Sequence, residues 1–162
     1  MSSRVVYFRS RPRQIVEEVR KALCEPRLFR DIRTRNKNGR NAIVLVSGDT
    51  GAGKSRFAGW MVETLDSSFI SSWQNGTPNI SISPLPMIEA LKYDLLPPGS
   101  WWFIDEPRDV KNVNWREEVA QALRDVLTEY RFKIVNLVVC SPMFKKVQND
   151  LRDLAHYWVR ME

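Results

Sequence analysis

Eight consecutive residues match the phosphate-binding pattern G-x-x-x-x-G-K-[ST]: Gly48, Asp49, Thr50, Gly51, Ala52, Gly53, Lys54 and Ser55. The glycines permit positive φ and close backbone approach, so successive N–H groups can face phosphate oxygens. Lys54 is expected to reach the β- and γ-phosphates, and the Ser55 hydroxyl is expected to ligate magnesium. The stretch from Gly48 to Arg56 therefore predicts a site for a nucleoside triphosphate, taken to be ATP with Mg²⁺.

The residues on either side of this motif suit that chemistry. An apolar run from Ala42 to Ser47 precedes it and predicts a buried strand, and a helical pattern from Arg56 to Leu65 follows it. Strand, glycine-rich loop and helix form the context that such a motif requires, and the helix N-terminus adds about half a positive charge. A glycine turn that carries Lys-Ser by chance is the alternative, and both flanks argue against it.

A second pair of chemically useful residues follows the apolar run Trp101 to Ile104. Asp105 and Glu106 end this predicted strand about 50 residues after the phosphate motif, which is the form of a Walker B motif. Asp105 is expected to hold magnesium through its water shell. Glu106 is placed to polarise the water that attacks the γ-phosphate.

The remaining patterns alternate between strand and helix. Apolar runs predict five strands, at residues 42–47, 79–83, 101–104, 134–140 and 156–159. Helical spacing predicts segments at residues 13–23, 28–32, 56–65, 86–95, 115–132 and 144–155. This alternation predicts an α/β fold of three layers, with a mostly parallel five-stranded sheet, a central P-loop strand and right-handed crossovers. We expect a P-loop core at residues 41–162 behind a basic helical N-terminal arm at residues 1–40, of which residues 1–12 are extended or disordered.

The two motifs and the strand that ends at Ser141 resemble the additional-strand, catalytic-glutamate class of P-loop ATPases, with a RecA/FtsK-like fold. The resemblance implies that this strand lies between the P-loop strand and the Walker B strand, and that Ser141 is a sensor of the γ-phosphate. An ordinary strand exit at Ser141-Pro142 is the alternative.

Within that class, the chain is most similar to the HerA/FtsK-type group, which includes small ATPases of archaea and their viruses and zonula-occludens-toxin-like phage proteins. The likeness covers roughly residues 41–160. It departs from the FtsK-type pumps, which carry Gln where Ser141 stands and which have a large DNA-gripping insertion.

The resemblance also implies a ring-forming homo-oligomer in which an arginine of one subunit reaches the γ-phosphate of its neighbour. Five arginines could take this part: Arg108, Arg116, Arg124, Arg131 and Arg152. Arg131, before the strand that ends at Ser141, suits the resemblance best. A surface ion pair is the alternative for each of them.

Charge is distributed unevenly along the chain. Residues 1–41 contain 12 Lys or Arg against 4 Asp or Glu, whereas residues 42–162 contain 13 against 15. The basic segment predicts an acidic partner, nucleic acid and above all DNA, with a merely solvated basic helix as the alternative.

No run reaches the roughly 18 apolar residues of a membrane span, and no secretory signal is evident, so a cytoplasmic protein with the reduced, buried thiols Cys24 and Cys140 is expected. The one histidine, His156, is expected to be structural.

Three functions fit these features. The first is an oligomeric ATP-hydrolysing motor on nucleic acid, in genome packaging, DNA translocation or replication of a virus or mobile element. The second is a small P-loop kinase, although residues 141–155 lack an arginine-rich lid and the pair of carboxylates favours water as acceptor. The third is a slow nucleotide-dependent switch or assembly factor that docks through its N-terminal helix.

Overall fold

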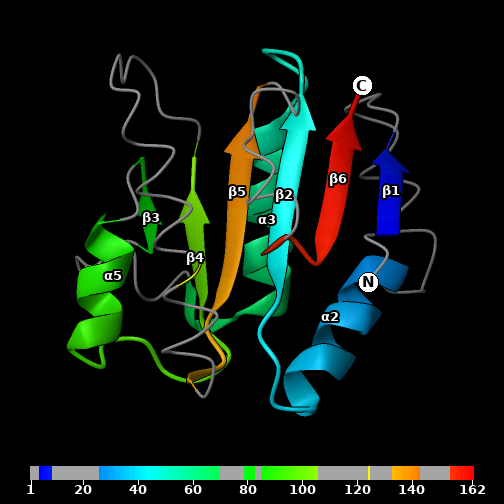
Figure 1. Ribbon diagram of the computed structural model, residues 1–162. Coiled ribbons are helices and arrows are strands. Elements are labelled where there is room, and N and C mark those ends of the chain that lie inside the picture. Colours follow the sequence, from blue (N-terminus) through cyan, green and yellow to red (C-terminus); the bar gives the residue numbers. More distant parts are fainter. Residues whose placement is uncertain are drawn as a thin grey trace.

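The computed structural model describes residues 26–69, 79–82, 85–105, 124, 133–142 and 154–162, together with the backbone of residues 4–8. Within these ranges the chain forms one sheet of six parallel strands, with helices packed on its faces (Figure 1). The spatial order of the strands is β1 (Arg4–Phe8), β6 (Tyr157–Met161), β2 (Ile43–Gly48), β5 (Asn136–Ser141), β4 (Trp101–Ile104) and β3 (Ile80–Ser81).

Alternate residues of the central strand β2 enter two different hydrophobic clusters. Val44 and Val46 join a cluster with helices α2 (Arg27–Lys37) and α3 (Lys54–Leu65), whereas Ile43 and Leu45 join one with helix α5 (Leu85–Lys92). A strand that is buried on both faces needs apolar residues at every position, which explains the continuous apolar run. The three-layer α/β fold predicted from the sequence is therefore confirmed.

The strand order agrees with the expected topology. The strand that ends at Ser141, β5, pairs with the P-loop strand β2 on one side and with the Walker B strand β4 on the other. The five predicted strands are present, and β2 lies inside the sheet as expected. The sixth strand, β1, was not predicted: it extends the sheet beyond β6, with Arg4 opposite Tyr157 and Phe8 opposite Met161.

Several predicted boundaries are wrong. The strand expected at residues 79–83 contains only Ile80 and Ser81, and Ile134 has a φ of 53° in the turn before β5 rather than strand geometry. Helix α5 ends at Lys92, although the predicted segment continued to Leu95, which is 58% exposed. The predicted helices at residues 13–23, 115–132 and 144–155 lie outside the described residues, except for Arg124, Leu154 and Ala155.

Polar groups fix the edge of the sheet at which the strands begin. The fully buried Asn136 accepts a hydrogen bond from the Ala42 N–H at 2.8 Å and donates one to the Gly99 carbonyl at 3.1 Å. The Asp66 carboxylate, after α3, accepts a bond from the Trp101 N–H at 3.0 Å, where β4 begins. These bonds tie the starts of β2, β4 and β5 to one another, because a buried amide or carboxylate must satisfy its hydrogen-bonding capacity inside the protein.

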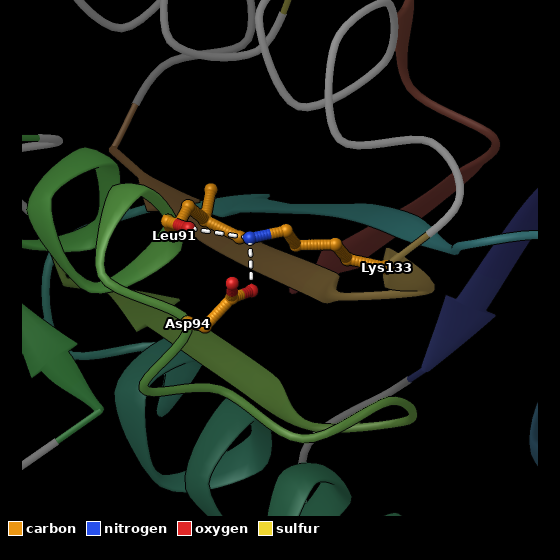
Figure 2. Close-up of polar contacts among 3 residues, drawn as sticks. All are labelled: Leu91, Asp94 and Lys133. Carbon is orange, nitrogen blue, oxygen red and sulfur yellow. Dashed lines mark hydrogen bonds and ion pairs between the residues drawn. The ribbon is translucent and has the colours of Figure 1, made fainter.

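A lysine joins α5 to the start of β5. Lys133 donates to the Leu91 carbonyl at 2.7 Å and also contacts the Asp94 carboxylate (Figure 2). A cation beside the last carbonyls of a helix opposes the negative end of its dipole. The contact therefore supports the end of α5 and its position beside the sheet.

The described cysteine, Cys140, is 1% exposed inside the α3-side cluster, which confirms the prediction for that thiol. Cys24 lies outside the described residues. None of the helices in the described ranges is long and apolar enough to cross a membrane.

Candidate nucleotide-binding site

The loop between β2 and α3 has the backbone geometry that the phosphate motif predicts. Gly51 and Gly53 have φ values of 87° and 83°, and Gly53 is the N-cap of α3. The Ala52 N–H donates to the Asp49 carbonyl at 3.1 Å and closes the turn, and the Phe57 N–H donates to the Gly53 carbonyl at 2.9 Å and begins the helix. Residues with a Cβ rarely adopt such φ values, so glycine at these positions is required by the turn.

The Lys54 ammonium folds back over this loop. Its Nζ donates to the Gly48 and Asp49 carbonyls, each at 2.9 Å, and the residue is only 5% exposed. Lys54 is the first residue of α3, so its charge lies at the N-terminus of a helix, where the dipole also favours an anion. The cation and the first N–H groups of α3 thus occupy the same end of the sheet as the loop. The exposed residues Asp49, Thr50 and Arg56 flank them.

The structure brings the two predicted magnesium ligands together. The Ser55 hydroxyl donates to Asp105 Oδ1 at 2.7 Å, although the two residues are 50 positions apart in the sequence. Asp105 follows β4 directly, and its own N–H donates to the Ser81 carbonyl at 3.0 Å, which fixes its backbone beside β3. A hydroxyl and a carboxylate are oxygen ligands of the kind that Mg²⁺ prefers, with water and phosphate oxygens completing its shell.

This donor set fits a magnesium–nucleotide complex better than an all-protein metal site. Within the described ranges no group of three or more His, Cys, Asp or Glu residues could hold a metal ion. Mg²⁺ is commonly bound through one or two protein oxygens plus substrate phosphates, which matches Ser55 and Asp105 beside a phosphate loop.

Ser141 lies at the same edge of the sheet. It ends β5 opposite Ser47 of β2, and β5 separates the P-loop strand from the strand that leads to Asp105. Because all strands are parallel, their carboxyl ends meet at one edge. The topology therefore brings the end of β5 to the edge at which the phosphate loop lies, and the sensor role of Ser141 remains a prediction.

Two predicted site residues, Glu106 and Arg131, lie outside the described residues. Among the other candidate arginines, only Arg124 is described, and it is an exposed residue in helical conformation.

The last strand supports the phosphate loop in a way that sequence reasoning missed. Gly48 is paired with Met161 of β6, and a Cβ added at Gly48 would lie 2.4 Å from the Met161 carbonyl oxygen. The Trp158 indole, also on β6, donates to the Ser47 hydroxyl at 2.6 Å. The first motif glycine thus permits close packing of two backbones, and only knowledge of the neighbouring strand could have revealed this.

His156 lies at the opposite end of the strands, away from the candidate site. Its Nδ1 accepts a hydrogen bond from the Ile43 N–H at 3.0 Å, and its own backbone N–H donates to the Ile43 carbonyl at 2.9 Å. Burial, and secondarily the charge of Arg35, lowers the pKa of His156 to about 4. The imidazole is therefore neutral near pH 7 and joins β6 to β2, in accordance with the structural role predicted for it.

Comparison with solved structures agrees with this topology. The chain is similar to RuvB R170A of Thermotoga maritima, with a TM-score of 0.52 and 17% identity, over 89% of this chain and 47% of that one. The chain has the three-layer fold of P-loop NTPases. This comparison supports the fold but gives no support to the HerA/FtsK-type group. The chain spans about half the length of this structural neighbour.

No protein-family model matches the chain, and no curated protein matches it.

Proposed function

We propose that this protein binds ATP with Mg²⁺ at residues 48–56 and hydrolyses it. The contact of 2.7 Å between Ser55 and Asp105 carries the proposal, because it places the end of a phosphate loop against the end of a Walker B strand. Neither residue type is unusual at a strand or helix end. Their meeting across a parallel sheet, with Lys54 over the loop between them, matches the arrangement that phosphoryl chemistry requires.

Each residue has a distinct part in this proposal. Lys54 and the N–H groups of the loop bind the phosphates, while Ser55 and Asp105 hold the metal, whose charge offsets that of the phosphates. Glu106 takes a proton from the attacking water. Ser141, at the end of the strand between the two motifs, donates a hydrogen bond toward the γ-phosphate.

We further propose that the protein acts as a homo-oligomer on nucleic acid, with Arg131 reaching the site of a neighbouring subunit. The excess of basic residues before residue 41 supports a nucleic-acid partner. The resemblance to the HerA/FtsK-type group rests on the two Walker motifs. The proposed role in genome packaging, DNA translocation or replication rests on the same two motifs. The division into residues 1–40 and 41–162 also remains a proposal.

The catalytic part is tested by Glu106→Gln, measured by ATP binding and by phosphate release. The exchange keeps the shape of the side chain and removes the base, so binding should be unchanged while hydrolysis falls at least 100-fold. Glu63→Gln, on the exposed side of α3, is the matched control and should leave both quantities unchanged. Unchanged hydrolysis in Glu106→Gln would exclude Glu106 as the base.

The metal site is tested by Ser55→Ala, with Thr64→Ala on the same helix as the control. The Ser55 variant should need more Mg²⁺ for half-maximal hydrolysis, because one oxygen ligand is lost. Thr64 donates to the Trp60 carbonyl at 2.7 Å within the helix, so its removal should not alter the Mg²⁺ dependence. The same dependence in both variants would argue against Ser55 as a ligand.

The acceptor is tested by measuring turnover with and without single- or double-stranded DNA, on protein of measured oligomeric state. Faster turnover with DNA supports the proposed motor. Turnover that requires an added small molecule as phosphate acceptor would instead indicate a kinase.

A further inference from the structure

Helix α2 presents a row of cations to solvent. Arg27, Arg30, Arg33 and Lys37 follow one another at spacings of three or four residues, and Arg40 comes just after the helix. All five are exposed. Residues at these spacings lie on one side of a helix. With a rise of about 1.5 Å per residue, the helical part of the row is about 15 Å long.

The opposite side of α2 is embedded in the protein. Leu28, Phe29 and Ile32 are buried, and the Phe29 ring lies 5.0 Å from the Trp60 ring of α3, centroid to centroid. Arg33 also donates to the Thr64 carbonyl at 2.9 Å, near the end of α3. The row of cations is therefore held in place by the ATPase core.

The stability of the helix does not explain the start of this row, although Lys37 lies in the last turn, at the negative end of the dipole, where a cation is favourable. Like charges three or four positions apart are unfavourable in a helix, and Arg27 and Arg30 lie at the positive end of the helix dipole. The first turn contains no acidic residue, and the N-cap, Pro26, makes no side-chain capping bond. Within the part of the chain that the structure describes, we find no carboxylate paired with Arg27, Arg30, Lys37 or Arg40.

The composition of α2 favours a nucleic acid over a lipid bilayer as the partner of this row. A bilayer-binding helix needs apolar residues on its outer side, but the only apolar residues of α2 are the three that face the core. Guanidinium groups match phosphate geometry with two parallel hydrogen bonds, and four of the five cations in the row are arginines. The length of the row corresponds to about four or five nucleotide steps of 3.4 Å along one strand.

We propose that the outer face of α2, formed by Arg27, Arg30, Arg33, Lys37 and Arg40, binds the phosphate backbone of a nucleic acid. This proposal rests on the proposed function in one respect, the choice of nucleic acid as the partner. It does not depend on ATP hydrolysis, because binding at α2 requires none. Helix α2 lies toward the end of the sheet where the strands begin, and the phosphate loop lies at the other end (Figure 1). Nucleic acid bound there would contact a surface separate from the nucleotide site.

The test compares two triple variants of the full chain that lose the same charge. Arg27→Gln, Arg30→Gln and Lys37→Gln remove three cations of the row, and Lys92→Gln, Arg124→Gln and Arg160→Gln remove three exposed cations elsewhere. Binding of fluorescent single- and double-stranded DNA is measured over a series of salt concentrations. The α2 variant should bind at least tenfold more weakly than the control, and its salt slope on duplex DNA should fall by about 2.7, since each lost phosphate contact removes about 0.9.

A charge-preserving variant separates loss of binding from loss of folding. Arg27→Lys with Arg30→Lys keeps the cations and should retain most of the affinity. Equal weakening in both triple variants would overturn the proposal, because net charge alone would then explain binding. Unaltered binding in the α2 variant would overturn it, as would binding of the wild type to vesicles of anionic lipid with no binding to DNA.

The basal ATPase rate, measured without DNA, keeps the two proposals distinguishable. The α2 variant should hydrolyse ATP as the wild type does, because none of its three residues belongs to the nucleotide site. Loss of DNA binding with an unchanged basal rate supports the α2 surface. An inactive wild type that still binds DNA through α2 would refute the proposed hydrolysis and leave this surface supported.

Discussion

Replacing Gly48 by alanine should damage the fold more than the same change at the other glycines of the phosphate motif. The added Cβ would lie 2.4 Å from the Met161 carbonyl oxygen and 3.0 Å from the Met161 Cβ. Ordinary contact begins at 3.4 Å, so the two strands must separate by about 1 Å at this position. Gly48 also has a φ of 153°, which an alanine rarely adopts.

The cost follows from what this separation breaks. The end of the β2–β6 ladder would lose one or two hydrogen bonds, at about 1 kcal/mol each, and buried Val159 and Met161 would lose packing worth about 1–2 kcal/mol. Backbone strain adds about 1 kcal/mol. We therefore expect the free energy of unfolding to fall by about 3–5 kcal/mol, and Tm to fall by roughly 6–20 °C for a chain of this length.

The assay is thermal and denaturant unfolding without nucleotide, with two control variants. A Cβ at Gly51, with a φ of 87°, meets nothing within 4 Å, so Gly51→Ala carries only strain and should lose about 1–2 kcal/mol. Gly59, inside α3, also has nothing within 4 Å, and Gly59→Ala should gain about 0.5–1 kcal/mol. If Gly48→Ala costs no more than Gly51→Ala, the contact with β6 does not explain this glycine.

Two further predictions concern polar side chains that bind backbone N–H groups. The folded-state pKa of His156, about 4, lies below its ordinary value of 6.5, so the unfolded chain takes up the proton first as the pH falls. The contribution of His156 to the free energy of unfolding should be fully present above about pH 6.5. It should be lost between pH 6.5 and pH 4, by about 1–2 kcal/mol after allowance for solvent screening. His156→Gln should abolish this part of the pH dependence, measured by denaturant unfolding. Asp66→Asn should lower the free energy of unfolding by about 1–3 kcal/mol, because one oxygen that accepts from the Trp101 N–H or from Ser68 is replaced by an NH₂ donor. The control Glu63→Gln should change it by less than about 0.5 kcal/mol. An equal loss in both variants would contradict this reasoning.

The elements that sequence reasoning predicted well are those with a strong local pattern. Strands β2, β4 and β5 consist mostly of apolar residues, and α2 was indicated by the spacing of Leu28, Phe29 and Ile32, which are all buried. These patterns can be read from the sequence, because apolar residues recur along the chain at the spacing of the strand or helix that buries them.

The end of α5 shows why boundaries were less predictable. The predicted segment continued to Leu95, but α5 ends at Lys92 and Asp94 has a φ of 55°, which is not a helical value. Leu96, at 7% exposure, is buried in its place, while Leu95 is 58% exposed. Lys133, from a segment 39 positions away, contacts this turn (Figure 2), and no local pattern contains that information.

The edge strands depended even more on distant partners. β1 contains only five residues, and its partner β6 lies about 150 positions away in the sequence. β3 contains two residues, opposite Phe103 and Ile104 of β4. A short edge strand is defined by the hydrogen bonds that it makes to its neighbour, and the sequence does not reveal which strand that neighbour is.

The phosphate loop was predictable from the sequence because its chemistry is contiguous: glycines, a lysine and a serine within eight residues form both the turn and the anion site. The tertiary structure alone brought Asp105 to 2.7 Å from Ser55 and placed β6 against Gly48. Both contacts join segments at least 50 positions apart, and they form because parallel strands pair through long crossovers whose order no local pattern encodes.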